Sequence, residues 1–159
     1  MNLHLEKLNY TFSKKPILVG GRAMEYYHLR KSGEDIDLIA PEVDVMALIK
    51  LYPDRVKNLY SDSGVCPFEF EIWRTIQLRK YDDLIEGAIE EQNYFVISLE
   101  KLLLMKALAM SKEKYLEDTR LVAKKINENQ YRNYSEEKLK VDALLAQFKK
   151  ISYIEKFEG

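Results

Sequence analysis

Two adjacent glycines, Gly20 and Gly21, separate a short apolar run from a segment with helical periodicity. The run at 16–19 predicts a buried strand, and the residues at 22–31 predict a helix. Because glycine has no Cβ, the backbone between these elements can turn sharply, and a phosphate group can approach it closely. The free N–H groups at the start of the helix would then face that anion. A tight turn without a ligand is the alternative interpretation of the same pattern.

The next apolar segment carries two acidic residues at alternate positions. Asp35 and Asp37 alternate with Ile36 and Leu38, which predicts a strand over 35–40. Side chains two residues apart in a strand point to the same side, so both carboxylates share one face. They repel each other unless a cation lies between them, and hard oxygen ligands favour Mg²⁺ or Mn²⁺. The alternative is a polar, solvent-facing edge strand.

The cleanest alternation in the chain covers 68–73, where Glu69 and Glu71 stand between apolar residues. The apolar face of this predicted strand contains Phe68, Phe70 and Ile72. If the strand pairs with 35–40, one glutamate joins the two aspartates as a third carboxylate. A polar outer face is again the alternative.

The remaining pattern predicts helices at 2–12, from 41 to about 51, at 82–91, from 98 to about 110, at 113–128 and at 136–156, and a strand at 94–97. Ser98 and Ser135 are the expected N-caps of two of these helices. The last helix has an expected buried stripe of Leu139, Leu144, Leu145, Phe148, Ile151 and Ile154. The fold class is therefore α+β, with a small mixed sheet and helices over 1–97 followed by a C-terminal helical bundle over 98–159.

Composition narrows the class of function. Lys and Arg number 25 and Asp and Glu 26, for a net charge of −1, which argues against a protein that coats nucleic acid but allows a local basic pocket. Purely apolar runs such as 102–105 are too short to span a bilayer. No charged leader precedes an apolar block, and the single Cys66 is consistent with a reducing compartment. We therefore expect a cytoplasmic protein without a membrane partner.

In this order, the motifs resemble those of the DNA polymerase β-type nucleotidyltransferase superfamily. Its members share a strand, a Gly-Gly or Gly-Ser turn, a helix, a strand with Asp-x-Asp and a later strand with a third acid. The matching stretches here are 17–21, 22–31 and 35–38. Stretches 96–106 and 114–118 resemble the helical part of small bacterial members, among them toxin–antitoxin and abortive-infection proteins. The resemblance covers roughly residues 16–126.

The resemblance implies a nucleotidyltransferase fold and two-metal chemistry. Asp35 and Asp37 would bridge two magnesium or manganese ions about 4 Å apart, and Glu71 would hold the ion that activates the acceptor. We prefer Glu71 to Glu69 because its acid-plus-apolar context better matches the family. A nucleoside monophosphate would pass from a nucleoside triphosphate to a hydroxyl of a protein, a tRNA end or a small molecule. The residues expected to contact the nucleotide are Gly20, Gly21, Arg30, Ser32, Lys106 and Lys112.

The chain departs from the family pattern at three places. Arg22 replaces a small residue, Ser32 lies three residues before Asp35 instead of one or two, and the third acid is a glutamate. A second hypothesis is therefore a catalytically silent module of the same fold that acts as an antitoxin-like or regulatory partner. A third is a helical interaction domain that binds through 136–156. The apolar stripe of that helix also suggests a homodimer.

Overall fold

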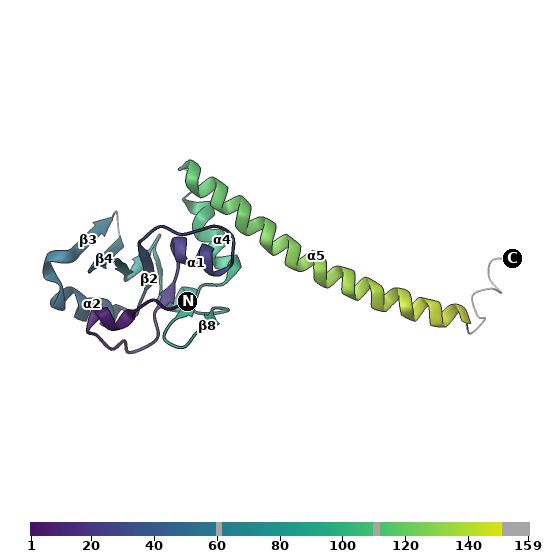
Figure 1. Cartoon of the computed structure of the whole chain (residues 1–159), viewed down its shortest axis with the longest axis horizontal. Helices are drawn as coiled ribbons and strands as arrows, with labels where there is room; N and C mark the ends of the chain where they lie inside the picture. The colour runs from purple at the N-terminus through teal and green to yellow at the C-terminus, as the bar shows by residue number, and fades with distance from the viewer. Residues whose placement is uncertain (60–61, 110–111, 151–159) are drawn as a thin grey trace. The chain divides into compact units, whose positions relative to one another are not determined.

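The computed structural model describes residues 1–59, 62–109 and 112–150, except for the side chains of 133–135, 144–145 and 147–150. The chain separates into two compact units, Met1–Val122 and Ala123–Gly159. The first unit contains the strands, the shorter helices and the beginning of the long helix α5 (Figure 1). In the second unit, the described residues are the continuation of α5.

A seven-stranded mixed sheet forms the framework of the first unit, in the order β3-β4-β5-β2-β1-β9-β8 (Figure 1). Its strands are β1 (Ile17–Leu18), β2 (Ile36–Ile39), β3 (Val56–Leu59), β4 (Asp62–Val65), β5 (Phe70–Trp73), β8 (Ile89–Glu90) and β9 (Phe95–Val96). A separate two-stranded ribbon pairs β6 (Thr75–Ile76) with β7 (Arg79–Lys80). The pairs β1·β9 and β2·β5 are parallel and β1·β2 is antiparallel, so the predicted mixed sheet is confirmed.

The α-helices are α1 (Gly20–Tyr26), α2 (Glu42–Leu51), α3 (Tyr81–Leu84), α4 (Leu99–Leu108) and α5 (Glu113–Lys150). Two short 3₁₀ helices are η1 (Leu5–Leu8) and η2 (Pro53–Arg55). The Ser98 side chain accepts a hydrogen bond from the Lys101 N–H at 3.3 Å, which confirms the predicted N-cap of α4. Among the described residues, no helix has both the length and the apolar character needed to cross a bilayer.

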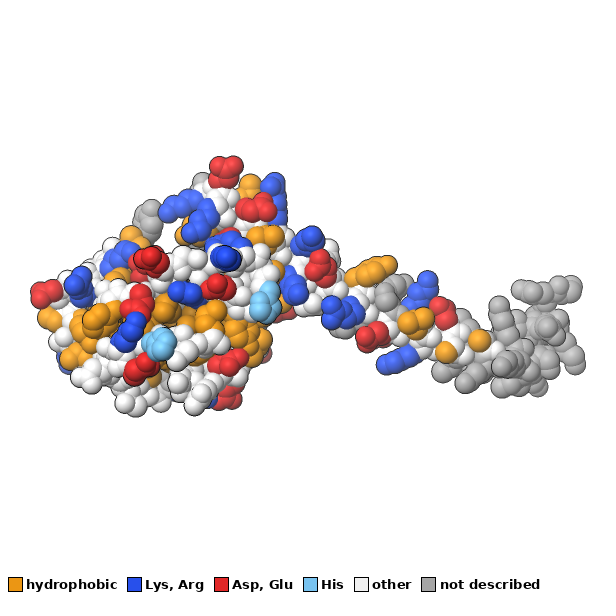
Figure 2. All heavy atoms as spheres, in the orientation of Figure 1, with side chains coloured by type: hydrophobic (Ala, Val, Ile, Leu, Met, Phe, Trp, Pro, Cys, Tyr) orange, Lys and Arg blue, Asp and Glu red, His pale blue; other side chains and the backbone are white. Residues whose placement is uncertain are grey.

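The core of the first unit forms where the apolar faces of the central strands meet α1. Leu18, Leu38 and Ile72 are fully buried, and α1 packs on β2. The alternation in β2 turns Ile36 and Leu38 into this core, while Asp37 between them is only partly buried. On the face of the first unit seen in Figure 2, acidic and basic side chains are interspersed, in keeping with the nearly balanced charge.

Two predicted helices are shorter than the sequence suggested. The helix expected over 22–31 begins at Gly20 and ends at Tyr26, because the chain turns at His28, which has a φ of 57°. The helix expected over 2–12 is confined to η1, whose flanking residues His4 and Asn9 adopt left-handed conformations. Helical periodicity did not reveal these backbone reversals.

Two predictions in the middle of the chain were also wrong. The acidic segment 82–91 is not one helix: α3 ends at Leu84, Gly87 has a φ of 76°, and β8 follows. Phe68 does not face the core, because it is exposed and has a φ of 54°, so that β5 begins only at Phe70.

After α4, the described residues of the C-terminal region form one long helix and not the two helices of the predicted bundle. Helix α5 covers the gap between the expected helices at 113–128 and 136–156, so Ser135 lies inside it and does not begin a new helix. The segment contains neither glycine nor proline to end the helix. In the expected buried stripe, Leu139 is 69% exposed. The side chains of Leu144, Leu145 and Phe148, and residues Ile151 and Ile154, lie outside the described residues.

Candidate functional site

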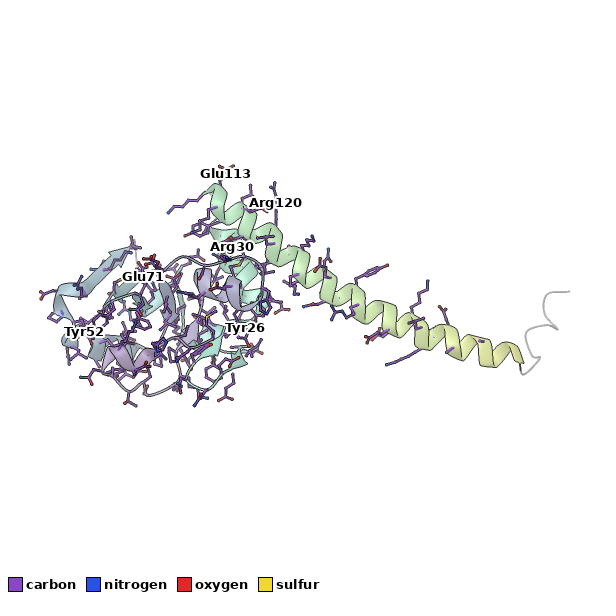
Figure 3. The ribbon with its side chains drawn as sticks, in the orientation of Figure 1. Tyr26, Arg30, Tyr52, Glu71, Glu113 and Arg120 are labelled. Carbon is purple, nitrogen blue, oxygen red and sulfur yellow. The ribbon has the colours of Figure 1, made fainter. Side chains whose placement is uncertain are left out.

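Asp37 and Glu71 lie directly opposite each other on the parallel strands β2 and β5. Neighbouring strands are about 4.8 Å apart, so the two carboxylates share one part of the sheet face. Both line a cavity of about 200 Å³ that is also lined by Gly20 and by Lys106 from α4. Glu71 (labelled in Figure 3) stands on β5 next to Asp37, as the sequence predicted, but Asp35 lies before the first residue of β2 and has no partner in this register.

The Asp37 carboxyl group is in an environment that disfavours its ionised form. Burial, followed by the nearby charge of Glu71, raises the pKa of Asp37 to about 6. The negative charge of Asp35 acts in the same direction, whereas the positive charge of Lys106 and a hydrogen bond from the Gly21 N–H oppose it. The ionised form of Asp37 is therefore disfavoured mainly because the carboxyl group is buried, and further because Glu71 lies nearby.

This raised pKa predicts how metal-free stability depends on pH. The folded-state pKa of about 6 exceeds the ordinary value of 3.8, so the folded protein holds a proton that the unfolded chain has lost between these values. Stability should therefore fall as pH rises across this window, by at most roughly 3 kcal/mol from this group. Asp37→Asn removes the contribution and should make the protein more stable than wild type above pH 6 in a chelating buffer.

Urea unfolding of both proteins across that pH range measures the difference. The stability advantage of Asp37→Asn should shrink as pH falls below 6. A constant difference between the two proteins at all pH values would contradict the raised pKa.

The two candidate glutamates have different surroundings. The Glu71 carboxylate accepts a hydrogen bond from the Lys57 ammonium at 2.8 Å, and that ammonium lies 5.8 Å from the centroid of the Trp73 ring. Glu69 lies in the turn before β5 and pairs with Lys7, beside a different cavity that the N-terminal residues line. Of the two glutamates, Glu71 is thus the one that the structure brings to Asp37.

Gly20 is the glycine that the site geometry requires. It has a φ of 62°, and an added Cβ would lie 2.0 Å from Oδ2 of Asp37. Only glycine lets the chain pass so close to this carboxylate. At Gly21, a Cβ would meet its nearest atom, Cβ of Ser32, at 3.7 Å, an ordinary contact. The Val19 N–H donates to the Asp37 carbonyl at 3.0 Å, so the backbone just before this turn is bonded to the strand that carries Asp37.

The side chains of Arg30 and Lys106 both bind the carboxylate of Asp118, which lies in the first turns of α5. The Arg30 guanidinium donates to both carboxylate oxygens, at 2.5 and 2.8 Å, and the Lys106 ammonium lies 2.7 Å from Oδ2. Asp118 is 1% exposed and Lys106 6%. Burial acts to raise the pKa of Asp118, but the hydrogen bonds from Arg30 and Lys106 hold it below its ordinary value. Burial lowers the pKa of Lys106, against the effect of Asp118.

The other predicted site residues lie outside the described lining of the cavity. Asp35 is exposed just before β2. The Ser32 hydroxyl donates to Glu25 on α1 at 2.7 Å. Lys112 lies with its ammonium 5.9 Å from the centroid of the Tyr115 ring. None of these three, nor Arg30, belongs to the described lining of the cavity.

Sequence reasoning missed three residues that shape the cavity or hold its charged groups. Lys57 binds Glu71, Asp118 holds Lys106, and Gln77 lines the cavity. Asp118 had a weak signal, because it ends the stretch 114–118 that is part of the family resemblance. Lys57 and Gln77 had none, since their roles depend on the pairing of strands.

Within the described ranges, no group of three or more His, Cys, Asp or Glu side chains has a geometry that could hold a metal ion. Comparison with models of protein families, with curated proteins and with solved structures finds no match to this chain. The functional interpretation therefore rests on the chemistry of the cavity itself.

Proposed function

We propose that the protein is a metal-dependent nucleotidyltransferase that moves a nucleoside monophosphate from a nucleoside triphosphate to an acceptor hydroxyl. The observation that carries the proposal is the register of β2 and β5, which pairs Asp37 with Glu71 in a cavity also lined by Lys106. Two carboxylates beside a buried ammonium suit a polyphosphate chelated to a divalent cation. The order of the motifs along the chain, which resembles the DNA polymerase β-type superfamily, supports the same function.

A hard divalent cation fits the donor set of this cavity. Asp37 and Glu71 offer oxygen ligands on neighbouring strands, and burial together with the charge of Glu71 raises the pKa of Asp37. Asp37 and Glu71 would hold Mg²⁺ or Mn²⁺ in the cavity, and Asp35, which lies just outside it, is the third ligand that the family resemblance implies. When bound, the metal would polarise the phosphate oxygens and favour attack by the acceptor hydroxyl.

The side chains around the carboxylates have complementary roles in this proposal. Lys106, held by Asp118, supplies positive charge to phosphate oxygens. Lys57 neutralises Glu71 in the metal-free protein and would be displaced from it when a cation binds. Gly20, which has no Cβ, lets the chain pass close to the Asp37 carboxylate.

Asp37→Asn should weaken binding of a magnesium nucleoside triphosphate by about ten- to hundredfold, because it removes one anionic ligand but keeps the shape. Calorimetric titration with ATP, GTP, CTP and UTP in turn, each with magnesium, measures the affinity. Transfer of label from the α-phosphate to protein, tRNA or a small hydroxyl compound measures activity. The matched control is Glu69→Gln, which removes a carboxylate that pairs with Lys7 outside the cavity and should leave affinity unchanged. Equal affinities of Asp37→Asn and wild type would contradict the proposed site.

The second candidate function is a catalytically silent module of the same kind, acting as an antitoxin-like or regulatory partner. The observation in its favour is that Lys57 and Lys106 already neutralise part of the acidic charge without a metal. The two functions differ in turnover. Nucleotide binding with no transfer to any acceptor class would favour the silent module, and labelled product would favour the enzyme.

A further inference from the structure

The cavity is lined by apolar and aromatic residues as well as by the acidic site, and we call these residues its apolar part. Besides Asp37, Glu71 and Lys106, its walls include Trp73, Ile76, Met105 and Tyr115. Its volume of about 200 Å³ is smaller than the roughly 300–1,000 Å³ of typical ligand pockets, so it suits part of a nucleotide. Apolar and aromatic walls suit a flat base better than a ribose or a phosphate.

Gln77 lines the same cavity, in the two-residue turn that joins β6 to β7. Gln77 and Leu78 have φ values of 53° and 65°, a conformation that hairpin turns usually achieve with Asn-Gly. Asp62 holds the turn in place, because its carboxylate accepts hydrogen bonds from the Gln77 N–H at 3.0 Å and from the Thr75 hydroxyl at 2.9 Å. The turn thus holds two residues other than glycine in left-handed backbone conformations that steric clashes disfavour.

The orientation of the Gln77 amide follows from its contact with α4. Its Nε2 donates to the Met105 carbonyl at 3.2 Å. A carbonyl can only accept, so this contact fixes the NH₂ group toward α4 and leaves Oε1 as an acceptor. Oε1 is buried and has no hydrogen-bond partner among the described residues. Buried hydrogen-bond acceptors nearly always have a donor in folded proteins, so we expect Oε1 of Gln77 to have one as well.

We propose that Gln77 determines base specificity, with Oε1 accepting a hydrogen bond from the exocyclic amino group of a nucleotide base in the apolar part of the cavity. This inference rests on the proposed function, because it assumes that the triphosphate end lies at Asp37 and Glu71. Adenine, guanine and cytosine carry such an amino group, and uracil and hypoxanthine do not. The site should therefore select for a base with an amino group.

Three pairs of magnesium triphosphates test the proposal by calorimetric titration: ATP with purine riboside triphosphate, GTP with inosine triphosphate, and CTP with UTP. In at least one pair, wild type should bind the aminated member about two- to tenfold more tightly. Gln77→Met, which keeps the length of the side chain but removes the acceptor, should bring that ratio close to one. Leu78→Asn, in the same turn but with an exposed side chain that is not in the cavity wall, should keep the wild-type ratio.

The possible results separate this inference from the proposed function. If wild type binds nucleotides but shows no preference in any pair, Gln77 does not read an amino group, whatever the variant does. A titration with magnesium 2′-deoxy-ATP covers the ribose. If Gln77→Met changes only the ratio between ATP and 2′-deoxy-ATP, the acceptor serves the ribose and the base assignment is wrong. If wild type binds no triphosphate at all, the proposed function fails and this inference fails with it.

Discussion

Gly20→Ala is expected to destabilise the protein by about 2–5 kcal/mol and to abolish nucleotide binding. The added Cβ would lie 2.0 Å from Oδ2, 2.8 Å from Cγ and 2.9 Å from Cβ of Asp37. Asp37 is fixed in β2 between Ile36 and Leu38, so its backbone cannot retreat without disturbing the core. The φ of 62° adds a separate cost for any residue other than glycine.

Two other glycines provide matched controls for urea unfolding. Gly33→Ala adds a Cβ with nothing within 4 Å, and Gly21→Ala adds one with its nearest contact at 3.7 Å. Neither has a positive φ, so each should change stability by less than about 1 kcal/mol. In the background Asp37→Ala, which lacks Oδ2 and Cγ, Gly20→Ala should cost less. Equal stability of Gly20→Ala and Gly33→Ala would show that the close approach to Asp37 does not exist.

The contrast between these glycines marks a limit of the sequence argument. The pair Gly20-Gly21 was recognisable because it interrupts an apolar run before a helix. Gly20, and not Gly21, has to be a glycine because of the position of Asp37, which lies on the later strand β2. Because this requirement arises from a tertiary contact, the local sequence pattern does not show it.

The acidic face was more accessible to prediction. Alternation with a period of two residues placed Asp37 opposite Ile36 and Leu38, and Glu71 opposite Phe70 and Ile72. Because both strands bury their apolar face in one core, their carboxylates share the other face, and the register pairs Asp37 with Glu71. In contrast, the choice between Glu69 and Glu71 required knowing that the strand begins at Phe70.

Two parts of the site had no local sequence signal. The ribbon β6·β7 turns at Gln77 and Leu78, which lack the glycine or asparagine by which such turns are recognised. The ion pairs of Asp118 join residues that are far apart in the chain, since Arg30 precedes it by 88 positions. The same sequence separation explains why the helical periodicity of 113–128 gave no indication that Asp118 is buried.

Asp118→Ala is expected to destabilise the protein by about 3–5 kcal/mol, because it leaves the buried ammonium of Lys106 without its partner. The control is Glu117→Ala, one residue earlier in α5, where an exposed carboxylate lies 3.6 Å from Arg120 and contributes little. Lys106→Met should cost less than Asp118→Ala, because Arg30 would still bind both oxygens of Asp118. Urea unfolding compares the three variants at one pH.

The double variant Lys106→Met with Asp118→Leu decides whether the cost comes from an unpaired charge. Apolar side chains of similar size can replace a buried ion pair with little loss, so the double variant should be more stable than Asp118→Ala alone. Its nucleotide binding should still be weak, since no ammonium faces the phosphates. The pKa of Asp118 is below 3.8, so the wild-type advantage should be complete above that pH and shrink in more acidic solution. If Asp118→Ala cost no more than Glu117→Ala, the ammonium of Lys106 would have another partner, and its position beside Asp37 would no longer depend on α5.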